Sequence, residues 1–190
     1  IGAMANKYRN SGQVCVSANR IYVHETIYDE FSNRLAKKSS QLKVADGRTE
    51  GAQIGPLITP QAFKKVEEHV EDAVEKGAKI LTGGTSDNSG VQFYKPTVLT
   101  DINNNMKIYY EETFGPVAPI IKFKDENEVI EMANDTKYGL AGYFYSRDIG
   151  KIWRVAEALE YGMVGINAGV ISTEVAVSYT HLTLPTINWV

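Results

Sequence analysis

The only cysteine of the sequence, Cys15, follows the segment Arg9 to Val14 (RNSGQV), in which small and polar residues predominate. A cysteine kept for packing normally lies within a hydrophobic run. Gly12 lets the backbone bend, and the segment separates a helix-like stretch from a strand-like one, which is typical of a presented nucleophile. A thiol is nucleophilic as its thiolate, which nearby cations such as Arg9 or Arg20 would favour. The residue types alone leave an inert cysteine equally open, because free cysteine usually behaves as a small hydrophobe.

A thiol hydrolase or acyltransferase would pair Cys15 with a histidine. The candidates are His24, His69 and His181. His69 falls on a charged helix face and His181 in the last stretch of the chain, so only His24, at the end of the first expected strand, is close to the cysteine in sequence. For each of them a surface or strand-end histidine is the commoner role. A non-catalytic assembly module, with an incidental cysteine, is a further alternative.

The composition argues against several classes of partner. With 190 residues, of which 43% are hydrophobic and 23% charged, the chain is long enough for one well-packed core and part of a second. The formal net charge of −3 argues against nucleic acid, because phosphate binding usually requires a basic face. No apolar run approaches the length of a membrane span, so we expect no membrane partner. A single cysteine cannot form an internal disulfide, which favours a reducing, cytoplasmic setting.

From Arg20 onward, short β-branched or aromatic runs alternate with helical patterns, which predicts an α/β fold with a largely parallel sheet flanked by helices. The strands are expected over 20–24, 78–82, 117–123, 141–145 and 163–166, with a further extended segment over 93–100. Pro96 favours a sheet edge for that segment, because proline donates no ladder hydrogen bond. The apolar run over 117–123 predicts a buried strand.

Four helices are expected between these strands. Thr26 caps the first, which ends at residues 46–47, and Thr59 caps the second, which Gly77 ends. Asp125 begins the third, and Asp148 caps the fourth, which Gly162 closes. The expected apolar faces are Ile27, Phe31, Leu35 and Leu42; Phe63, Val66, Val70 and Val74; and, in the fourth helix, Ile149, Ile152, Trp153, Ala156 and Leu159. Residues 177–190 break this rhythm and could be an extended arm or foreign sequence.

Three blocks together resemble the catalytic half of an aldehyde dehydrogenase, in particular the succinate-semialdehyde branch. They are the nucleophile motif Gly12-Gln13-Val14-Cys15, the Glu-x-Phe-Gly-Pro block within 111–117, and the segment 160–167 leading into 171–176. The blocks occur in order and at family-like spacing, so the resemblance favours a catalytic cysteine over an inert one. It covers about residues 1–176, which the resemblance identifies as part of a catalytic domain.

The resemblance implies a mechanism. Cys15 would attack an aldehyde, with succinic semialdehyde as the expected small-molecule substrate, and form a thiohemiacetal whose oxyanion the Cys15 backbone N–H helps to bind. Hydride would pass to NAD or NADP, and water would hydrolyse the resulting thioester. The sequence does not distinguish the two cofactors. The resemblance also implies that the parent protein forms a homo-oligomer.

The resemblance further implies the roles of four residues. Glu112 matches the glutamate that holds the nicotinamide ribose, and Phe114 matches the aromatic residue beside the nicotinamide ring. A solvated charge and a core anchor are the ordinary alternatives for these two side chains. Arg9 matches the arginine that grips the distal carboxylate of the substrate, and Ser172 matches the serine that adds a hydrogen bond there. Arginine suits this task because its planar fork pairs a carboxylate with two parallel hydrogen bonds.

Arg20 and Asn167 also match family positions, and we expect them to support the structure rather than to react. The family's general base, its oxyanion asparagine and its nucleotide-binding domain precede the nucleophile and have no counterpart in these residues. The resemblance stops after residue 176. We therefore expect the chain to be a fragment of an oxidising enzyme that has little activity alone.

Overall fold

The computed structural model describes residues 2–171, and the strands in this range form two sheets. The larger sheet has the order β1-β4-β3-β2, in which β1 is Ile21–His24, β4 is Val117–Phe123, β3 is Thr97–Thr100 and β2 is Lys79–Thr82. The smaller sheet pairs β5 (Ala141–Phe144) with β6 (Met163–Ile166). In the described range, every pairing of these strands is parallel except that of β2 with β3. The expected α/β class with a largely parallel sheet is confirmed.

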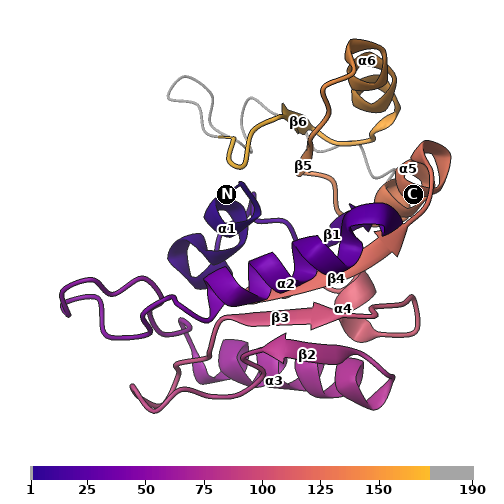
Figure 1. Ribbon diagram of the computed structural model, residues 1–190. Helices are drawn as coiled ribbons and strands as arrows, with labels where there is room; N and C mark the ends of the chain where they lie inside the picture. The colour runs from indigo at the N-terminus through magenta and orange to yellow at the C-terminus, as the bar shows by residue number, and fades with distance from the viewer. Residues whose placement is uncertain (1, 172–190) are drawn as a thin grey trace, which may run out of the picture.

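Helical segments connect and flank these strands. In chain order they are α1 (Gly2–Tyr8), η1 (Arg9–Gly12), η2 (Glu25–Ile27), α2 (Tyr28–Ser39), α3 (Pro60–Glu75), α4 (Lys107–Tyr110), α5 (Glu126–Asn134) and α6 (Ile149–Ala158). Figure 1 shows the four strands of the larger sheet side by side, with β5, β6 and α6 set apart from them. Every helix in the described range is too short or too polar to cross a lipid bilayer.

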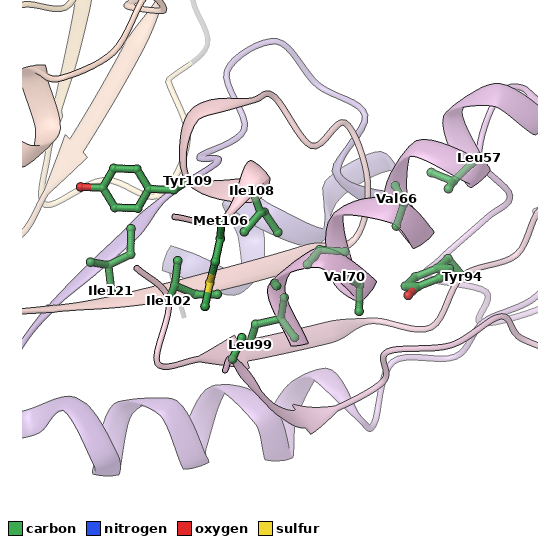
Figure 2. Packing of buried hydrophobic residues seen from close by; sticks show 13 residues of the cluster. Leu57, Val66, Val70, Tyr94, Leu99, Ile102, Met106, Ile108, Tyr109 and Ile121 are labelled. Atoms are coloured by element: carbon green, nitrogen blue, oxygen red, sulfur yellow. The ribbon is translucent and has the colours of Figure 1, made fainter. Parts of the chain in front are cut away.

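The larger sheet is covered on both faces, because neighbouring residues of a strand point to opposite sides. Val98 of β3 belongs to a buried cluster with Leu35 of α2. The next residue, Leu99, belongs to a second cluster with Val66 of α3. Figure 2 shows this second cluster, in which Leu99 and Val66 lie among side chains from α3, α4 and their connections. Full burial of each such side chain stabilises the fold by roughly 1.5–3 kcal/mol relative to exposure.

Strand β4 is the centre of the larger sheet and is buried along most of its length, as its apolar run predicts. Its residues 117–119 pair with β3, and its residues 120–123 pair with β1. The prediction of a sheet edge for 93–100 is wrong, because β3 lies between β4 and β2. Pro96 is tolerated because it precedes the strand, and the next residue, Thr97, donates its N–H to the carbonyl of Pro116 at 2.8 Å.

Three of the four expected helix starts are confirmed. Thr59, Asp125 and Asp148 each accept backbone N–H bonds of 3.0 to 3.1 Å from the first helical turn. Thr26 is not a helix cap, since it lies inside η2, where the ring of His24 accepts its N–H at 3.3 Å. Helix α2 therefore starts two residues later, at Tyr28, with no side-chain cap.

Some helix ends and faces differ from the predictions. Helix α2 ends at Ser39 rather than at residues 46–47. There the hydroxyl of Ser39 donates to the carbonyl of Leu35 at 2.8 Å, and such bonds compete with helix continuation. In α3 the expected Val74 is 41% exposed, whereas His69 is buried and faces the core instead. The prediction of a charged surface position for His69 is therefore wrong.

Helix α6 ends at Ala158 rather than at Gly162, and part of its expected apolar face is exposed. Ile149 is 68% exposed and Trp153 is 64% exposed, so residues 2–171 leave most of these two side chains uncovered. The other members of the expected face are half-buried: Ile152, Ala156 and Leu159. The periodicity of α6 is helical, as predicted, but periodicity does not show which surface a helix packs against. The expected strands over 141–145 and 163–166 are confirmed as β5 and β6.

Candidate functional site

The cysteine loop, residues 9–19, starts with a strained turn directly after α1. Asn10, Ser11 and Gly12 have φ values of 50°, 58° and 77°, all in the left-handed region. This conformation costs a residue with a side chain roughly 1–2 kcal/mol, whereas glycine adopts it freely. Two consecutive non-glycine residues keep it only where specific bonds hold them.

The bonds that hold the cysteine loop come from the segment 55–58. The hydroxyl of Ser11 accepts the N–H of Gly55 at 2.9 Å and donates to the carbonyl of the same residue at 3.0 Å. The side chain of Gln13 accepts the N–H of Ile58 at 2.8 Å and donates to the carbonyl of Pro56 at 3.3 Å. Gln13 of the motif Gly-Gln-x-Cys is therefore an anchor of the loop.

Cys15 lies at the tip of a turn in which the N–H of Ser17 donates to the carbonyl of Val14 at 2.9 Å. The residue is exposed at the surface of the described chain. Asn6 of α1 holds the far side of the turn, since its amide oxygen accepts the N–H of Ala18 at 2.6 Å. The turn presents the thiol outward on a fixed backbone.

The cysteine loop lies directly against the segment Glu111 to Gly115. A Cβ built at Gly12 would overlap the carbonyl oxygen of Gly115, so only glycine allows this approach. On the other side of the cysteine, the side-chain oxygen of Asn19 accepts the N–H of Thr113 at 2.8 Å. Two of the three sequence blocks, about 100 residues apart, thus form one site.

Glu112 is half-buried, and Phe114 is 36% exposed beside the close contact at Gly115. The charge of Glu112 acts on Lys7 of α1, where it raises the pKa of the ammonium group against a larger effect of burial. Glu112 is therefore within electrostatic range of the helix that leads into the cysteine loop. The site combines a thiol, a carboxylate and a partly exposed aromatic ring.

His69 of α3 contacts the Glu111 to Gly115 segment through both of its ring nitrogens. It is 2% exposed, with Nδ1 at 2.8 Å from the hydroxyl of Thr113 and Nε2 at 3.2 Å from the carboxylate of Glu111. Burial lowers the pKa of His69, and the Glu111 carboxylate partly opposes this. Both ring nitrogens are engaged, so His69 is not available to Cys15 as a base. Its position on α3 beside Val66 and Val70 is compatible with burial, but the contacts with Thr113 and Glu111 decide it.

The other histidines give the hydrolase alternative no support. His24 lies at the end of β1 that is remote from the cysteine loop, and its Nδ1 is 2.8 Å from the hydroxyl of Thr26. His181 lies outside the described residues. In residues 2–171, no group of three or more His, Cys, Asp or Glu side chains is arranged to hold a metal ion.

Arg9 is exposed at the start of η1, six residues before the cysteine. Both groups act on Tyr143 of β5, where burial raises the pKa of the phenol most, Cys15 raises it further and Arg9 lowers it. The Tyr143 hydroxyl therefore has the thiol and the guanidinium as electrostatic neighbours. Ser172, the fourth expected site residue, lies outside the described residues.

Lys7, on the helix before the cysteine loop, is a buried lysine that the sequence analysis missed. It is 1% exposed, and its Nζ has no hydrogen-bond partner within residues 2–171. Burial lowers the pKa of Lys7 to about 8, and the Glu112 carboxylate opposes part of this effect. Lysine is almost never fully buried without a partner, and no local pattern in the sequence indicates this burial.

Arg20 and Asn167 are placed as supports. Arg20 donates to the carbonyls of Met132, Ala133 and Asp135 at 2.9 to 3.1 Å, which caps the end of α5. The side chain of Asn167 accepts the N–H of Ser146 at 3.0 Å and donates to its carbonyl at 2.9 Å. These bonds join β1 to α5 and the end of β6 to the end of β5.

The sequence of this chain is similar to those of known enzymes. Residues 2–180 match the model of the aldehyde dehydrogenase family. The chain is 54% identical over 175 residues to succinate-semialdehyde dehydrogenase (NADP(+)) of Escherichia coli (strain K12) and 56% identical over 175 residues to glutarate-semialdehyde dehydrogenase of Pseudomonas putida. In both cases the match covers 92% of this chain and 36% of the relative.

A solved structure shows the same relation in three dimensions. The crystal structure of succinate-semialdehyde dehydrogenase from Burkholderia pseudomallei superimposes with a TM-score of 0.90 at 57% identity, over 92% of this chain and 36% of that one. The chain thus spans about a third of the length of the relatives it matches.

Proposed function

This chain belongs to the aldehyde dehydrogenase family, and from this premise we propose that the complete protein oxidises an aldehyde with a distal carboxylate to the corresponding acid. Cys15 is the proposed nucleophile. The observation that carries the proposal is the contact between the cysteine loop and the Glu111 to Gly115 segment, made by Gly12 against Gly115 and by Asn19 with Thr113.

In the proposed first step, the thiolate of Cys15 attacks the aldehyde carbon. A carbon–sulfur bond forms, and the carbonyl π electrons move to oxygen, which becomes an oxyanion. Among the hydrogen bonds of residues 2–171, the backbone N–H of Cys15 donates none, so it is free to bind this oxygen. The strained turn before the cysteine keeps that N–H and the sulfur in a fixed relation.

The residues of the site fit a nicotinamide dinucleotide. The half-buried carboxylate of Glu112 can accept hydrogen bonds from ribose hydroxyls, and the exposed ring of Phe114 offers a face for a flat heterocycle. When bound, NAD or NADP supplies the hydride acceptor for the reaction. Cys15 then carries the acyl group as a thioester until water releases the acid.

Arg9 is the proposed recognition residue for the distal carboxylate, with Ser172 as its proposed partner. An exposed guanidinium near the nucleophile can pair a carboxylate through two parallel hydrogen bonds. The names of the two relatives above both denote semialdehydes of dicarboxylic acids, which supports this choice. A neutral aldehyde would leave the charge of Arg9 unpaired.

On the same resemblance, we propose that residues 1–176 are part of the catalytic domain and that residues 177–190 are an extended arm or foreign sequence. The general base and the main nucleotide domain are proposed to lie elsewhere in the complete protein. The complete protein is further proposed to be a cytoplasmic homo-oligomer. The open apolar face of α6, with Ile149 and Trp153, supports a covering surface in the assembly.

The test uses the complete protein with succinic semialdehyde, glutaric semialdehyde and butanal. Cys15→Ser should lower kcat for all three by about 1,000-fold or more. Arg9→Ala should raise KM about 100-fold for the semialdehydes and change that for butanal little, which matches the loss of a charge-assisted hydrogen-bond pair. Arg147→Ala, another exposed arginine, is the control and should change neither. Equal effects of Arg9→Ala on butanal and on the semialdehydes would contradict the proposed carboxylate recognition.

A further inference from the structure

Tyr143 of β5 contacts the cysteine loop from a distant part of the chain. Its hydroxyl donates to the carbonyl of Val16, the residue after Cys15, at 2.9 Å. Asn6 donates to the same carbonyl at 3.4 Å. In Figure 1, β5 and β6 lie on the same side of the larger sheet as α1, which carries Asn6. The peptide that follows the nucleophile is thus held from two elements.

The ring of Tyr143 occupies space that the absence of a side chain at Gly165 leaves free. Tyr143 is paired with Gly165 of β6, and a Cβ built at Gly165 would lie 2.7 Å from the Cδ1 of the ring. A residue with a side chain at 165 would therefore displace the ring. The absence of a side chain at Gly165 lets the phenol reach across to Val16.

The surroundings of the hydroxyl keep it a donor. Burial raises the pKa of Tyr143, and this effect exceeds the opposing effects of hydrogen bonds with the Ile171 backbone and the Asn6 side chain. Cys15 raises the pKa further, and Arg9 lowers it by less than any of these. The phenol is therefore protonated near neutral pH and can donate to Val16. The nucleophile and the recognition arginine both lie within electrostatic range of this oxygen.

We infer that Tyr143 is a positioning residue, whose hydroxyl holds the carbonyl of Val16 and so sets the direction of the Cys15 sulfur. The inference rests on the proposed function, because a direction of the sulfur matters only if the sulfur attacks a carbon. Cys15 and Val16 are the central residues of the turn that the bond from Ser17 to Val14 closes. The hydrogen bond from Tyr143 to the carbonyl of Val16 therefore fixes the orientation of this turn relative to the rest of the loop. Misplacement of a nucleophile by about 1 Å can lower a rate by about 100-fold.

The test compares Tyr143→Phe with Tyr145→Phe in the complete protein. Tyr145 lies just beyond the same strand, is 58% exposed and serves as the control. Tyr143→Phe should lower kcat for succinic semialdehyde by about 10- to 100-fold, while KM and the dissociation constant of the cofactor, measured by fluorescence, change less than about 3-fold. Hydrogen exchange, read by mass spectrometry without cofactor, should show the Ser17 amide about 10-fold faster in Tyr143→Phe only, because its turn opens more often.

A merely structural role would lower the melting temperature and leave kcat unchanged well below it. Gly165→Ala provides a second variant, since it keeps the hydroxyl but displaces the ring, and it should show the same change in kcat without change in KM. If Tyr143→Phe equals the unmodified protein in kcat and in exchange of Ser17, the inference is wrong. That result differs from failure of the proposed function, in which Cys15→Ser would retain activity.

Discussion

Replacement of Lys7 by methionine should make the fold more stable at neutral pH. The two side chains have similar length, so Lys7→Met removes the charge and keeps the packing. In the structure Lys7 is 1% exposed, and its Nζ has no hydrogen-bond partner in the described residues. A buried ammonium without a partner is destabilising, because it loses its hydration.

The magnitude follows from the pKa of Lys7, which burial lowers from 10.5 to about 8 against the opposing effect of Glu112. A difference of this size corresponds to about 3 kcal/mol in the free energy of unfolding. Below pH 8 the lysine is protonated in both the folded and the unfolded chain, so the fold bears the whole penalty. As the pH rises from about 8 to about 10.5, the folded chain releases the proton while the unfolded chain keeps it, and stability increases.

The assay is urea unfolding of the chain at a series of pH values from 7 to 10. At pH 7 the free energy of unfolding of Lys7→Met should exceed that of the unmodified chain by up to about 3 kcal/mol. This difference should decrease steadily above pH 8. Lys64→Met is the control, because the Lys64 side chain is 76% exposed and its loss should change stability by less than about 0.5 kcal/mol. A loss of stability in Lys7→Met at pH 7, or an advantage that does not vary with pH, would refute the reasoning.

Two further predictions concern the supports of the site. Arg20→Met should lower the free energy of unfolding by about 3 kcal/mol or more, because three carbonyls lose a charged donor. The control is Arg154→Met, which breaks an exposed ion pair and should lower the free energy of unfolding by less than about 1 kcal/mol in the same denaturation assay. Gly12→Ala should lower the melting temperature of the complete protein strongly and abolish aldehyde oxidation, because its Cβ would overlap the carbonyl of Gly115. Gly51→Ala is the matched control, because Gly51 also has a positive φ, +73°, but open space around it. This replacement should lower the free energy of unfolding by only about 1–2 kcal/mol. Similar effects of the two glycine replacements would exclude the overlap as the cause.

Features that depend on a few neighbouring residues could be predicted from the sequence. Thr59, Asp125 and Asp148 cap their helices, because a cap is a bond between a side chain and an N–H two or three residues later. The buried strand at 117–123 is predicted by its unbroken apolar run. The failure at Thr26 has an equally local cause, since the neighbouring His24 takes its N–H.

Burial of single side chains could not be predicted in the same way. Helical spacing places Val74 and His69 on nearby faces of α3, and the contacts with Thr113 and Glu111 decide that His69 is the buried one. Pro96 suggests a sheet edge because proline lacks a backbone N–H donor, but β3, the strand that follows it, pairs with a neighbour on both sides. Such outcomes depend on residues far away in the chain.

For the candidate site, the resemblance that the three blocks carry indicated which residues to consider: Cys15, Arg9, Glu112 and Phe114. Residue types and short-range periodicity also determined the α/β class, because strands and helices differ in the repeat of their apolar residues. Only the tertiary structure decided that Gly12 lies on Gly115, that Tyr143 reaches Val16 and that Lys7 is enclosed without a partner in residues 2–171. The physical reason is that such contacts arise when sheets and helices pack, and packing joins residues whose separation along the chain carries no local signal.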